Sequence, residues 1–152
     1  MAKFIYKMEN ILNIKYKLEE EAKNVYGAAR AMLNLEEEKL QNLYEKQSFY
    51  EDQLKQLCTS TLDILAIRKC EDAIEIMKYN IKLQIIAVNN AKMQLEKARI
   101  KLNEAMVDRK THEKLKENAF ESFKEEIKGQ EKKEVDELVS FKFKKKSSSE
   151  DE

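Results

Sequence analysis

The stretch QLCTSTLDIL, residues 56–65, decides the fold, because strong helix formers give way here to residues that favour caps and turns. These residues are Cys58, Thr59, Ser60 and Thr61. The chain has no proline and only two glycines, so little else obliges it to turn. Ser60 followed by Asp63 resembles a capping box in which Asp replaces the usual Glu, which marks the start of a new helix. The stretch therefore predicts that the chain folds back on itself.

Composition predicts an all-α protein with a thin core. Lys, Glu, Leu, Ala, Asn, Ile and Met dominate the 152 residues, and the alternating Val, Ile, Thr and aromatic runs of a sheet protein are missing. Aromatic residues make up only 8% of the chain and the mean hydropathy is −0.72, which is little apolar material for a thick globular core. An elongated arrangement of long helices fits these values better than a compact domain.

The second half of the chain carries a heptad pattern, which predicts a second coiled-coil helix over residues 67–140. Steps of three and four give Ile67, Cys70, Ile74, Met77, Ile81, Gln84, Val88, Ala91, Leu95, Ala98, Leu102 and Ala105. In this series only Gln84 is polar. Such spacing keeps one narrow stripe, the seam, facing a partner helix in a left-handed coiled coil.

The first half predicts another coiled-coil helix over residues 1–58, with a less regular seam. The predicted seam consists of Phe4, Met8, Ile11, Leu18, Ala22, Val25, Ala29 and Met32, followed by Leu40, Leu43, Gln47, Tyr50, Leu54 and Leu57. Lys15 intrudes in this series, and an extra four-residue step near Glu36 reads as a stutter. Folding the two helices together buries both stripes, so the pattern favours an antiparallel hairpin.

A turn and tip over residues 59–66 completes the hairpin. With the turn centred near residue 62, residues pair when their numbers add to about 124, which sets Leu43 near Ile81 and Phe4 near Phe120. The apolar residues after the break are expected to cover the open end of the seam; they are Leu62, Ile64, Leu65 and Ile67. The second helix then continues as an overhang, and residues 141–152 have the composition of a disordered charged tail.

Charge and apolar patterning limit the classes of function. Basic and acidic residues balance at 29 each, which favours protein partners over nucleic acid or an anionic membrane. No apolar run is long enough to span a bilayer, and the N-terminus lacks the apolar core of a signal peptide, so we expect a cytoplasmic protein. Cys58, Cys70 and His112 are spaced unlike a metal site and are interpreted as structural side chains.

The motifs of catalysis are missing from the sequence, which predicts a protein that is not an enzyme. There is no Gly-rich phosphate loop, no HExxH and no nucleophile elbow. Acidic clusters such as residues 19–21 and 36–38 are better explained as solvated helix faces that pair with Lys than as metal sites. We therefore expect no cofactor and no bound metal. Exposed aromatic side chains are the stronger candidates for function, as anchors for protein contacts.

Both ends of the chain resemble the FliJ family of flagellar type III export proteins. In KFIYKMENILNIKYKLEEE, residues 3–21, the resemblance is carried by Phe4, Tyr6, Met8, Ile11, Leu12, Lys15 and Glu19. In EKKEVDELVSFKF, residues 131–143, it is carried by Glu131, Lys133, Asp136, Glu137 and Leu138. Length and hairpin pattern agree, so the resemblance covers nearly the whole chain.

The resemblance implies a central stalk of the export apparatus that serves bacterial flagellum biogenesis and motility. Such a stalk binds and stimulates the hexameric export ATPase, contacts the membrane export gate and handles empty export chaperones, and it lies at the cytoplasmic face of the membrane through these partners. By analogy, the ATPase-binding residues are Phe4, Met8, Ile11, Asp136 and Leu138. The gate-binding residues are Leu43 and Tyr50; the matching positions on the second helix depart from the family's spacing around Ile74 to Ile81.

Two alternatives remain open at the level of sequence. One is the equivalent stalk of a virulence-type secretion system. The other is a general coiled-coil scaffold or holdase, which would bind several unfolded proteins and ignore the ATPase.

Overall fold

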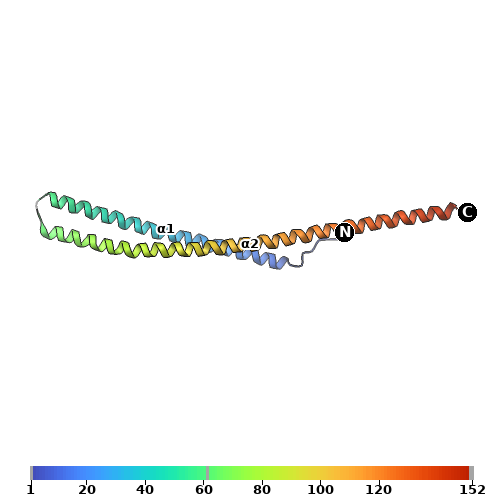
Figure 1. Ribbon diagram of the computed structural model, residues 1–152, viewed down its shortest axis with the longest axis horizontal. Helices are drawn as coiled ribbons and strands as arrows, with labels where there is room; N and C mark the ends of the chain where they lie inside the picture. The colour runs from blue at the N-terminus through green and yellow to red at the C-terminus, as the bar shows by residue number, and fades with distance from the viewer. Residues whose placement is uncertain (1, 61, 151–152) are drawn as a thin grey trace. The chain divides into compact units, whose positions relative to one another are not determined.

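A computed structural model describes residues 2–60 and 62–150, which form two long helices (Figure 1). The first helix, α1, spans Glu9–Thr59, and the second, α2, spans Ile64–Glu150. The described ranges contain no strand, and the two helices pack against each other as a two-helix hairpin. The predicted all-α hairpin is thus confirmed. Met1 of the expected first helix, Thr61 of the expected turn and residues 151–152 of the expected tail lie outside the described residues.

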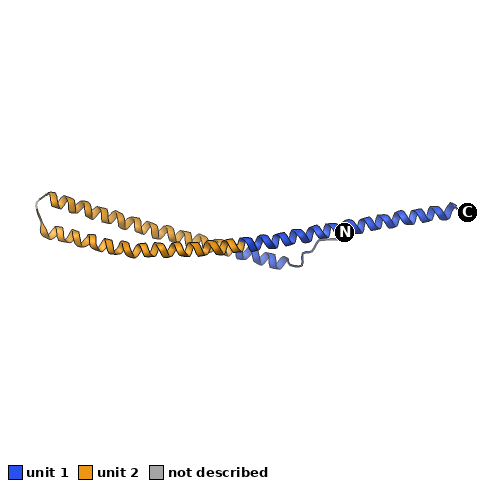
Figure 2. Ribbon diagram, in the orientation of Figure 1, with its two compact units in different colours: residues 1–18, 106–152 blue, residues 19–105 orange. Residues whose placement is uncertain are grey.

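The chain divides into two compact units, each containing part of both helices (Figure 2). Unit 1 comprises Met1–Leu18 and Met106–Glu152, and unit 2 comprises Glu19–Ala105. Unit 2 therefore contains the connection between the helices, and unit 1 contains the start of α1 and the last part of α2.

The seam predicted for the second helix is confirmed by burial. All twelve predicted positions from Ile67 to Ala105 are buried or half-buried, and the most buried side chains of α2 are among them. Ala98 is only 4% exposed and Val88 only 5% exposed. Small and branched side chains at these positions let the opposing helix approach closely, which supports the coiled-coil interpretation.

The seam predicted for the first helix is partly wrong, because α1 carries no stutter. The least exposed positions follow steps of three and four without interruption; they are Leu12, Lys15, Glu19, Ala22, Tyr26, Ala29, Leu33, Glu36, Leu40, Leu43, Gln47, Tyr50, Leu54 and Leu57. Leu18, Val25 and Met32 are exposed. Each of these three lies one residue before a seam position, about 100° around the helix, which is why an apolar stripe could be mistaken for the seam.

Contacts between α1 and α2 give the register of the antiparallel pair. In unit 2 the numbers of contacting residues add to 120, for Tyr50 with Cys70 and for Glu36 with Gln84. In unit 1 they add to 123 for Lys15 with Asp108. The predicted value of about 124 therefore holds in unit 1, but unit 2 is offset from it by about one helical turn. α1 ends at Thr59 and α2 begins at Ile64, so the connection is shorter than the predicted turn over residues 59–66.

The connection between the helices is capped by Asp63 rather than by Ser60. The Asp63 carboxylate accepts a hydrogen bond from the backbone NH of Ala66 at 3.3 Å, which is the N-cap arrangement of α2. The Ser60 hydroxyl donates to the Gln56 carbonyl at 3.2 Å, so Ser60 satisfies the end of α1. The expected capping box starting at Ser60 is therefore wrong by three residues.

The apolar residues of the tip do not cover the end of the seam as expected. Leu62, Ile64 and Leu65 are 78%, 69% and 65% exposed, and of these four residues only Ile67 is half-buried. Asp63 starts α2 immediately after Leu62, and this short connection leaves no room for an apolar lid.

Both ends of the chain differ from the sequence interpretation. Residues 2–8 are not helical, although the first helix was expected to include them. The segment from residue 141, expected as a disordered tail, continues α2 to Glu150. Residues 130–150 contain neither Gly nor Pro, so nothing in this part of the sequence breaks the helix. The hydroxyls of Ser147, Ser148 and Ser149 each donate to a carbonyl three residues earlier within it.

Candidate functional site

An aromatic cluster holds the N-terminal segment against α2 in unit 1. The ring of Phe4 lies 5.1 Å from that of Phe120 in an edge-to-face arrangement and 5.3 Å from that of Phe123. Tyr6 stacks on Phe4 at 6.4 Å. Aromatic pairs of this geometry contribute about 0.5–1.5 kcal/mol beyond their buried area. The cluster explains why this segment stays next to α2 although it is not helical.

Charged residues occupy the seam next to the aromatic cluster. The ammonium group of Lys15 lies 2.7 Å from the Asp108 carboxylate, and that of Lys116 lies 2.8 Å from the Glu9 carboxylate. The Tyr16 hydroxyl donates to the Glu113 carboxylate. The hydrogen bond from Lys15 lowers the pKa of Asp108, with the charge of Lys15 adding to the effect and desolvation opposing it. The two ion pairs and the hydrogen bond from Tyr16 link α1 to α2.

A cleft of about 620 Å³ lies between these groups in unit 1. Its lining combines the aromatic cluster with the charged seam and consists of Phe4, Glu9, Leu12, Tyr16, Glu113, Lys116, Glu117 and Phe120. Beside it Met8 is 48% exposed and Ile11 is 38% exposed, whereas their neighbour Leu12 is 2% exposed. Leu12 is therefore the packing residue, and Met8 and Ile11 remain accessible to another molecule.

The remaining ATPase-binding candidates lie on the part of α2 that has no helix beside it. Every residue from Lys128 to Glu150, a segment that we call the overhang, is exposed. Leu138 is 61% exposed, and Asp136 is exposed as well. Phe123, whose ring contacts Phe4, precedes Asp136 by thirteen residues, or about 20 Å of helix. The five candidates therefore form two groups in unit 1 rather than one patch.

The overhang combines apolar and basic side chains. Val135, Leu138 and Val139 follow the spacing of one helix face and are each more than half exposed. Phe141 and Phe143 are 66% and 76% exposed. Lysines follow at residues 142 and 144–146, with no acidic residue between positions 138 and 149. An isolated helix of this length gains little from its own packing, so its apolar face is available for a partner.

Leu43, the first gate-binding candidate, is half-buried in unit 2 beside a polar contact between the helices. It lines a cleft of about 460 Å³ together with Lys39, Asn42, Lys46, Asn80, Leu83 and Gln84. The Gln84 amide donates to the Glu36 carbonyl at 2.9 Å and to the Glu36 carboxylate. The bond from Gln84 lowers the pKa of Glu36, a hydrogen bond and the charge of Lys39 add to it, and desolvation opposes it.

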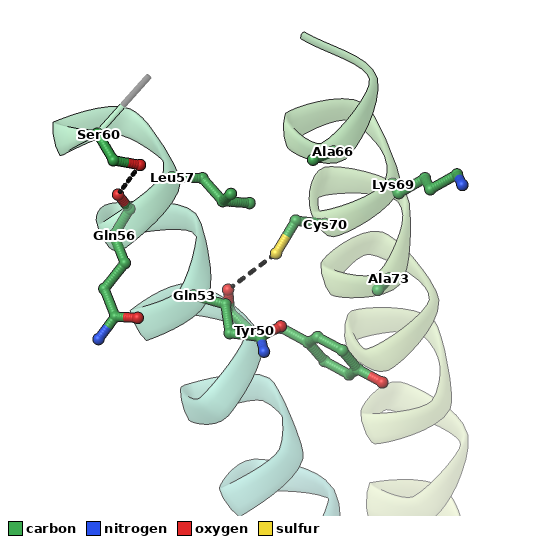
Figure 3. A pocket seen from close by; sticks show the side chains of 9 residues that line it. All are labelled: Tyr50, Gln53, Gln56, Leu57, Ser60, Ala66, Lys69, Cys70 and Ala73. Carbon is green, nitrogen blue, oxygen red and sulfur yellow. Dashed lines mark hydrogen bonds between the residues drawn. The ribbon is translucent and has the colours of Figure 1, made fainter. Parts of the chain in front are cut away.

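Tyr50, the second gate-binding candidate, lines a separate cleft of about 520 Å³ near the connection (Figure 3). In Figure 3, Tyr50 and Leu57 reach from α1 toward α2, where Cys70 and Ala73 face them. The Cys70 thiol donates to the Tyr50 carbonyl at 3.2 Å. Tyr50 is half-buried, whereas its neighbour Phe49 is 58% exposed and lies 5.7 Å from the Tyr50 ring.

The structure brings Leu43 and Tyr50 to the same seam but into different clefts. Sequence reasoning did not identify Glu36 as a seam residue, because its charge hid its place in the repeat. The uninterrupted steps of three and four through Leu33, Glu36 and Leu40 are the signal that would have shown it. His112 was interpreted as a packing residue, and its half-buried ring hydrogen-bonds the Asp108 carbonyl at 2.9 Å.

Residues 2–60 and 62–150 contain neither a membrane-spanning helix nor a cluster of metal ligands. Neither helix contains a stretch apolar and long enough to cross a bilayer. Within the same ranges, no group of three or more His, Cys, Asp or Glu side chains is placed to hold a metal ion.

Comparison with known proteins supports the resemblance seen at the two ends of the chain. CT670 of Chlamydia trachomatis, described as a YscO homolog, has a similar solved structure with a TM-score of 0.66 and 24% sequence identity. The similarity covers 91% of this chain and 94% of that one and shows a shared fold. No curated protein matches the sequence. The family described as flagellar FliJ protein matches residues 4–148, and the chain therefore belongs to the FliJ family.

Proposed function

We propose that the chain is the central stalk of a flagellar type III export apparatus and that it has no enzymatic activity of its own. In this role it binds and stimulates the hexameric export ATPase and connects it to the export gate and to export chaperones. It works in the cytoplasm and reaches the membrane only through these partners. Membership of the FliJ family supports the type III export role, and the two-helix fold is consistent with it.

The main observation that supports the proposed ATPase contact is the exposure of the α2 overhang. Residues 128–150 form a helix whose every residue is exposed, although it includes Val135, Leu138 and Phe141. Exposed apolar side chains on a helix with no packing of its own favour insertion into a protein groove. The ATPase contact is accordingly assigned to Asp136 and Leu138 on the overhang.

The second part of the proposed ATPase contact is the start of the chain. Met8 and Ile11 are accessible, and Phe4 fixes the segment that precedes α1 against α2. The N-terminal residues therefore form a second candidate contact surface in unit 1, which also contains the overhang. The gate contact is assigned to Leu43 and Tyr50 in unit 2, where each borders an open cleft.

The test is ATP hydrolysis by the purified flagellar ATPase of the same organism, titrated with this protein while ring formation is followed. We expect a saturable rise in activity at a substoichiometric ratio, near one chain per hexamer. A chain ending at Ile127 should keep its melting temperature, because the residues it loses are exposed, and should lose the stimulation. A general scaffold or holdase would leave hydrolysis unchanged, and that result would remove the stalk assignment.

A matched pair of variants separates the overhang from a general effect of surface charge. Leu138→Glu changes a residue that is 61% exposed on the overhang, and Val25→Glu changes one that is 56% exposed on α1. The first should weaken stimulation at least tenfold, whereas the second should leave it unchanged. Equal losses in the two variants would contradict the assignment of the ATPase contact to the overhang.

A further inference from the structure

The end of α2 carries a cluster of lysines in a chain whose formal net charge is zero. Basic and acidic residues number 29 each, but residues 139–149 contain four lysines and no acidic residue. The helix is continuous through this segment and ends at Glu150, and every residue of the segment is exposed. The neutral total therefore hides a local positive charge at the end of the overhang.

Three of the four lysines share one face of the helix with two apolar residues. A cleft of about 540 Å³ lies along this surface, which we call the basic face; it is lined by Val139, Lys142, Phe143, Lys145, Lys146 and Ser149. Steps of three, four and seven residues place these side chains on the same side of α2. Val139 and Phe143 are each more than half exposed, so the lysines flank apolar side chains that are open to solvent.

The composition of the basic face defines the chemistry of the surface that would bind it. Burial of Val139 and Phe143 requires an apolar floor. The lysine stems pack along such a floor, but their ammonium groups lose water as it closes over them, which is favourable only where carboxylates lie within reach. The basic face therefore fits a groove with an apolar floor and with Asp or Glu side chains along its edges.

Acidic residues on both sides of the basic face favour a protein groove over a lipid or nucleic-acid surface. Glu134, Asp136 and Glu137 precede the face on the same helix, and Glu150 follows it. A bilayer of anionic lipids or a nucleic-acid backbone presents uniform negative charge, so it repels these carboxylates while it attracts the lysines. A protein groove carries charges of both signs and can match the order of charges along the overhang.

We propose that the basic face binds an acidic groove of the export ATPase. This inference rests on the proposed function, which assigns Leu138 to the ATPase contact. Leu138 and Val139 continue the apolar spacing that begins at Val135, and Lys146 follows Val139 by about two turns of helix. A groove that receives Leu138 therefore continues onto the basic face. The attraction between lysines and carboxylates adds an electrostatic part to a contact that is otherwise apolar.

Binding of the full chain to the purified ATPase, measured by fluorescence anisotropy, tests the proposal. The label is placed on Cys58, which is exposed and lies in unit 2, outside the proposed ATPase contact. Replacing Lys142, Lys145 and Lys146 together by Glu should raise the dissociation constant at least tenfold, whereas replacing them together by Arg keeps the charge and should preserve binding. A rise in salt from about 50 mM to about 300 mM should weaken the natural chain several-fold and should not weaken the Glu variant.

A matched control reverses the charge of three lysines in unit 2. Lys92, Lys97 and Lys101 are exposed, and their replacement by Glu changes the net charge by the same amount. This variant should bind the ATPase within about twofold of the natural chain, because only charges near the contact remain unscreened. Circular dichroism should show the same helicity in both Glu variants, because all six positions are exposed.

Three results would overturn the proposal and leave the stalk role intact. They are equal weakening by the two Glu variants, binding that ignores salt, and unchanged ATPase stimulation after charge reversal of the basic face. Vesicles of equal parts phosphatidylglycerol and phosphatidylcholine are the second probe. If reversal abolished binding to these vesicles but not to the ATPase, the basic face would serve a membrane and the proposal would be wrong. A natural chain that neither binds nor stimulates the ATPase would reject the stalk role and the proposal together.

Discussion

The side-chain amide of Gln84 on α2 donates hydrogen bonds to both the backbone carbonyl and the carboxylate of Glu36 on α1. Both residues occupy seam positions, so a polar pair stands where leucines would pack. Polar seam residues of this kind fix the register of a coiled coil at a cost in stability. In this chain the pair fixes the register of unit 2, where opposed residue numbers add to 120.

We expect the polar pair to cost stability and to provide specificity. Gln84→Leu alone leaves the Glu36 carboxylate beside an apolar side chain, and should lower the melting temperature by several degrees. The double variant Glu36→Leu with Gln84→Leu should melt above the natural chain by several degrees, because two apolar side chains then pack in the seam. Thermal unfolding followed by circular dichroism measures both. A double variant less stable than Gln84→Leu would show that the pair itself stabilises the hairpin.

The pH dependence of stability follows from two carboxylates whose pKa values are lowered in the folded chain. Gln84 lowers the pKa of Glu36 from 4.5, and Lys15 lowers the pKa of Asp108 from 3.8. A lowered pKa means that the group stabilises the fold above its unfolded pKa and loses this contribution as the pH falls through its folded pKa. The melting temperature should therefore be flat at neutral pH and fall below about pH 4.5.

Two neutral variants identify the carboxylates responsible for the acid transition. Glu36→Gln and Asp108→Asn should each start from a lower melting temperature at pH 7 and show a shallower loss between pH 5 and 3 than the natural chain. Glu117→Gln is the control, because Glu117 has only an exposed pairing with Lys114 at 3.5 Å. If all three variants lost stability in parallel with the natural chain, the acid transition would arise elsewhere.

The corrected seam of α1 predicts opposite outcomes for two neighbouring residues. Leu33 is half-buried at a seam position, whereas Met32 is 53% exposed. Leu33→Ala should lower the free energy of unfolding by about 1–2 kcal/mol, and Met32→Ala should change it by less than about 0.5 kcal/mol. Denaturant titration separates these values. The reverse order would restore the seam that places Met32 between the helices.

The sequence determined the fold class because the seam of α2 is almost entirely apolar and repeats without interruption. The register of α1 was harder to predict, since Lys15, Glu19 and Glu36 occupy seam positions while an apolar stripe runs one residue earlier. Periodicity alone assigns a seam to the more apolar of two adjacent stripes, and only packing against α2 shows which one is buried. The contact between Phe4 and Phe120 was predicted correctly, because the two residue numbers add to 124, the value assumed for the register, and unit 1 keeps close to this value.

The candidate site was less predictable than the fold. Periodicity showed that Asp136 and Leu138 lie beyond the paired helices, but the charged, serine-rich composition of residues 141–152 ended the predicted helix at residue 140, ten residues too early. The clefts beside Leu43 and Tyr50 depend on how neighbouring side chains fill the seam, which a repeat pattern does not specify.

Phe4 provides the last prediction, because its ring joins the non-helical N-terminal segment to two rings of α2. Phe4→Ala should release residues 2–8 from α2, so that trypsin cleaves after Lys3 and Lys7 several times faster than in the natural chain. The melting temperature should change little, since Leu12 and the seam beyond it are untouched. Phe49→Ala is the control, because it removes an exposed ring from unit 2 and should leave cleavage at the N-terminus unchanged.

If the N-terminal segment forms part of the ATPase contact, Phe4→Ala should also raise the concentration needed for half-maximal stimulation. Faster cleavage with unchanged stimulation would confirm the anchoring role of Phe4 and limit the ATPase contact to the overhang.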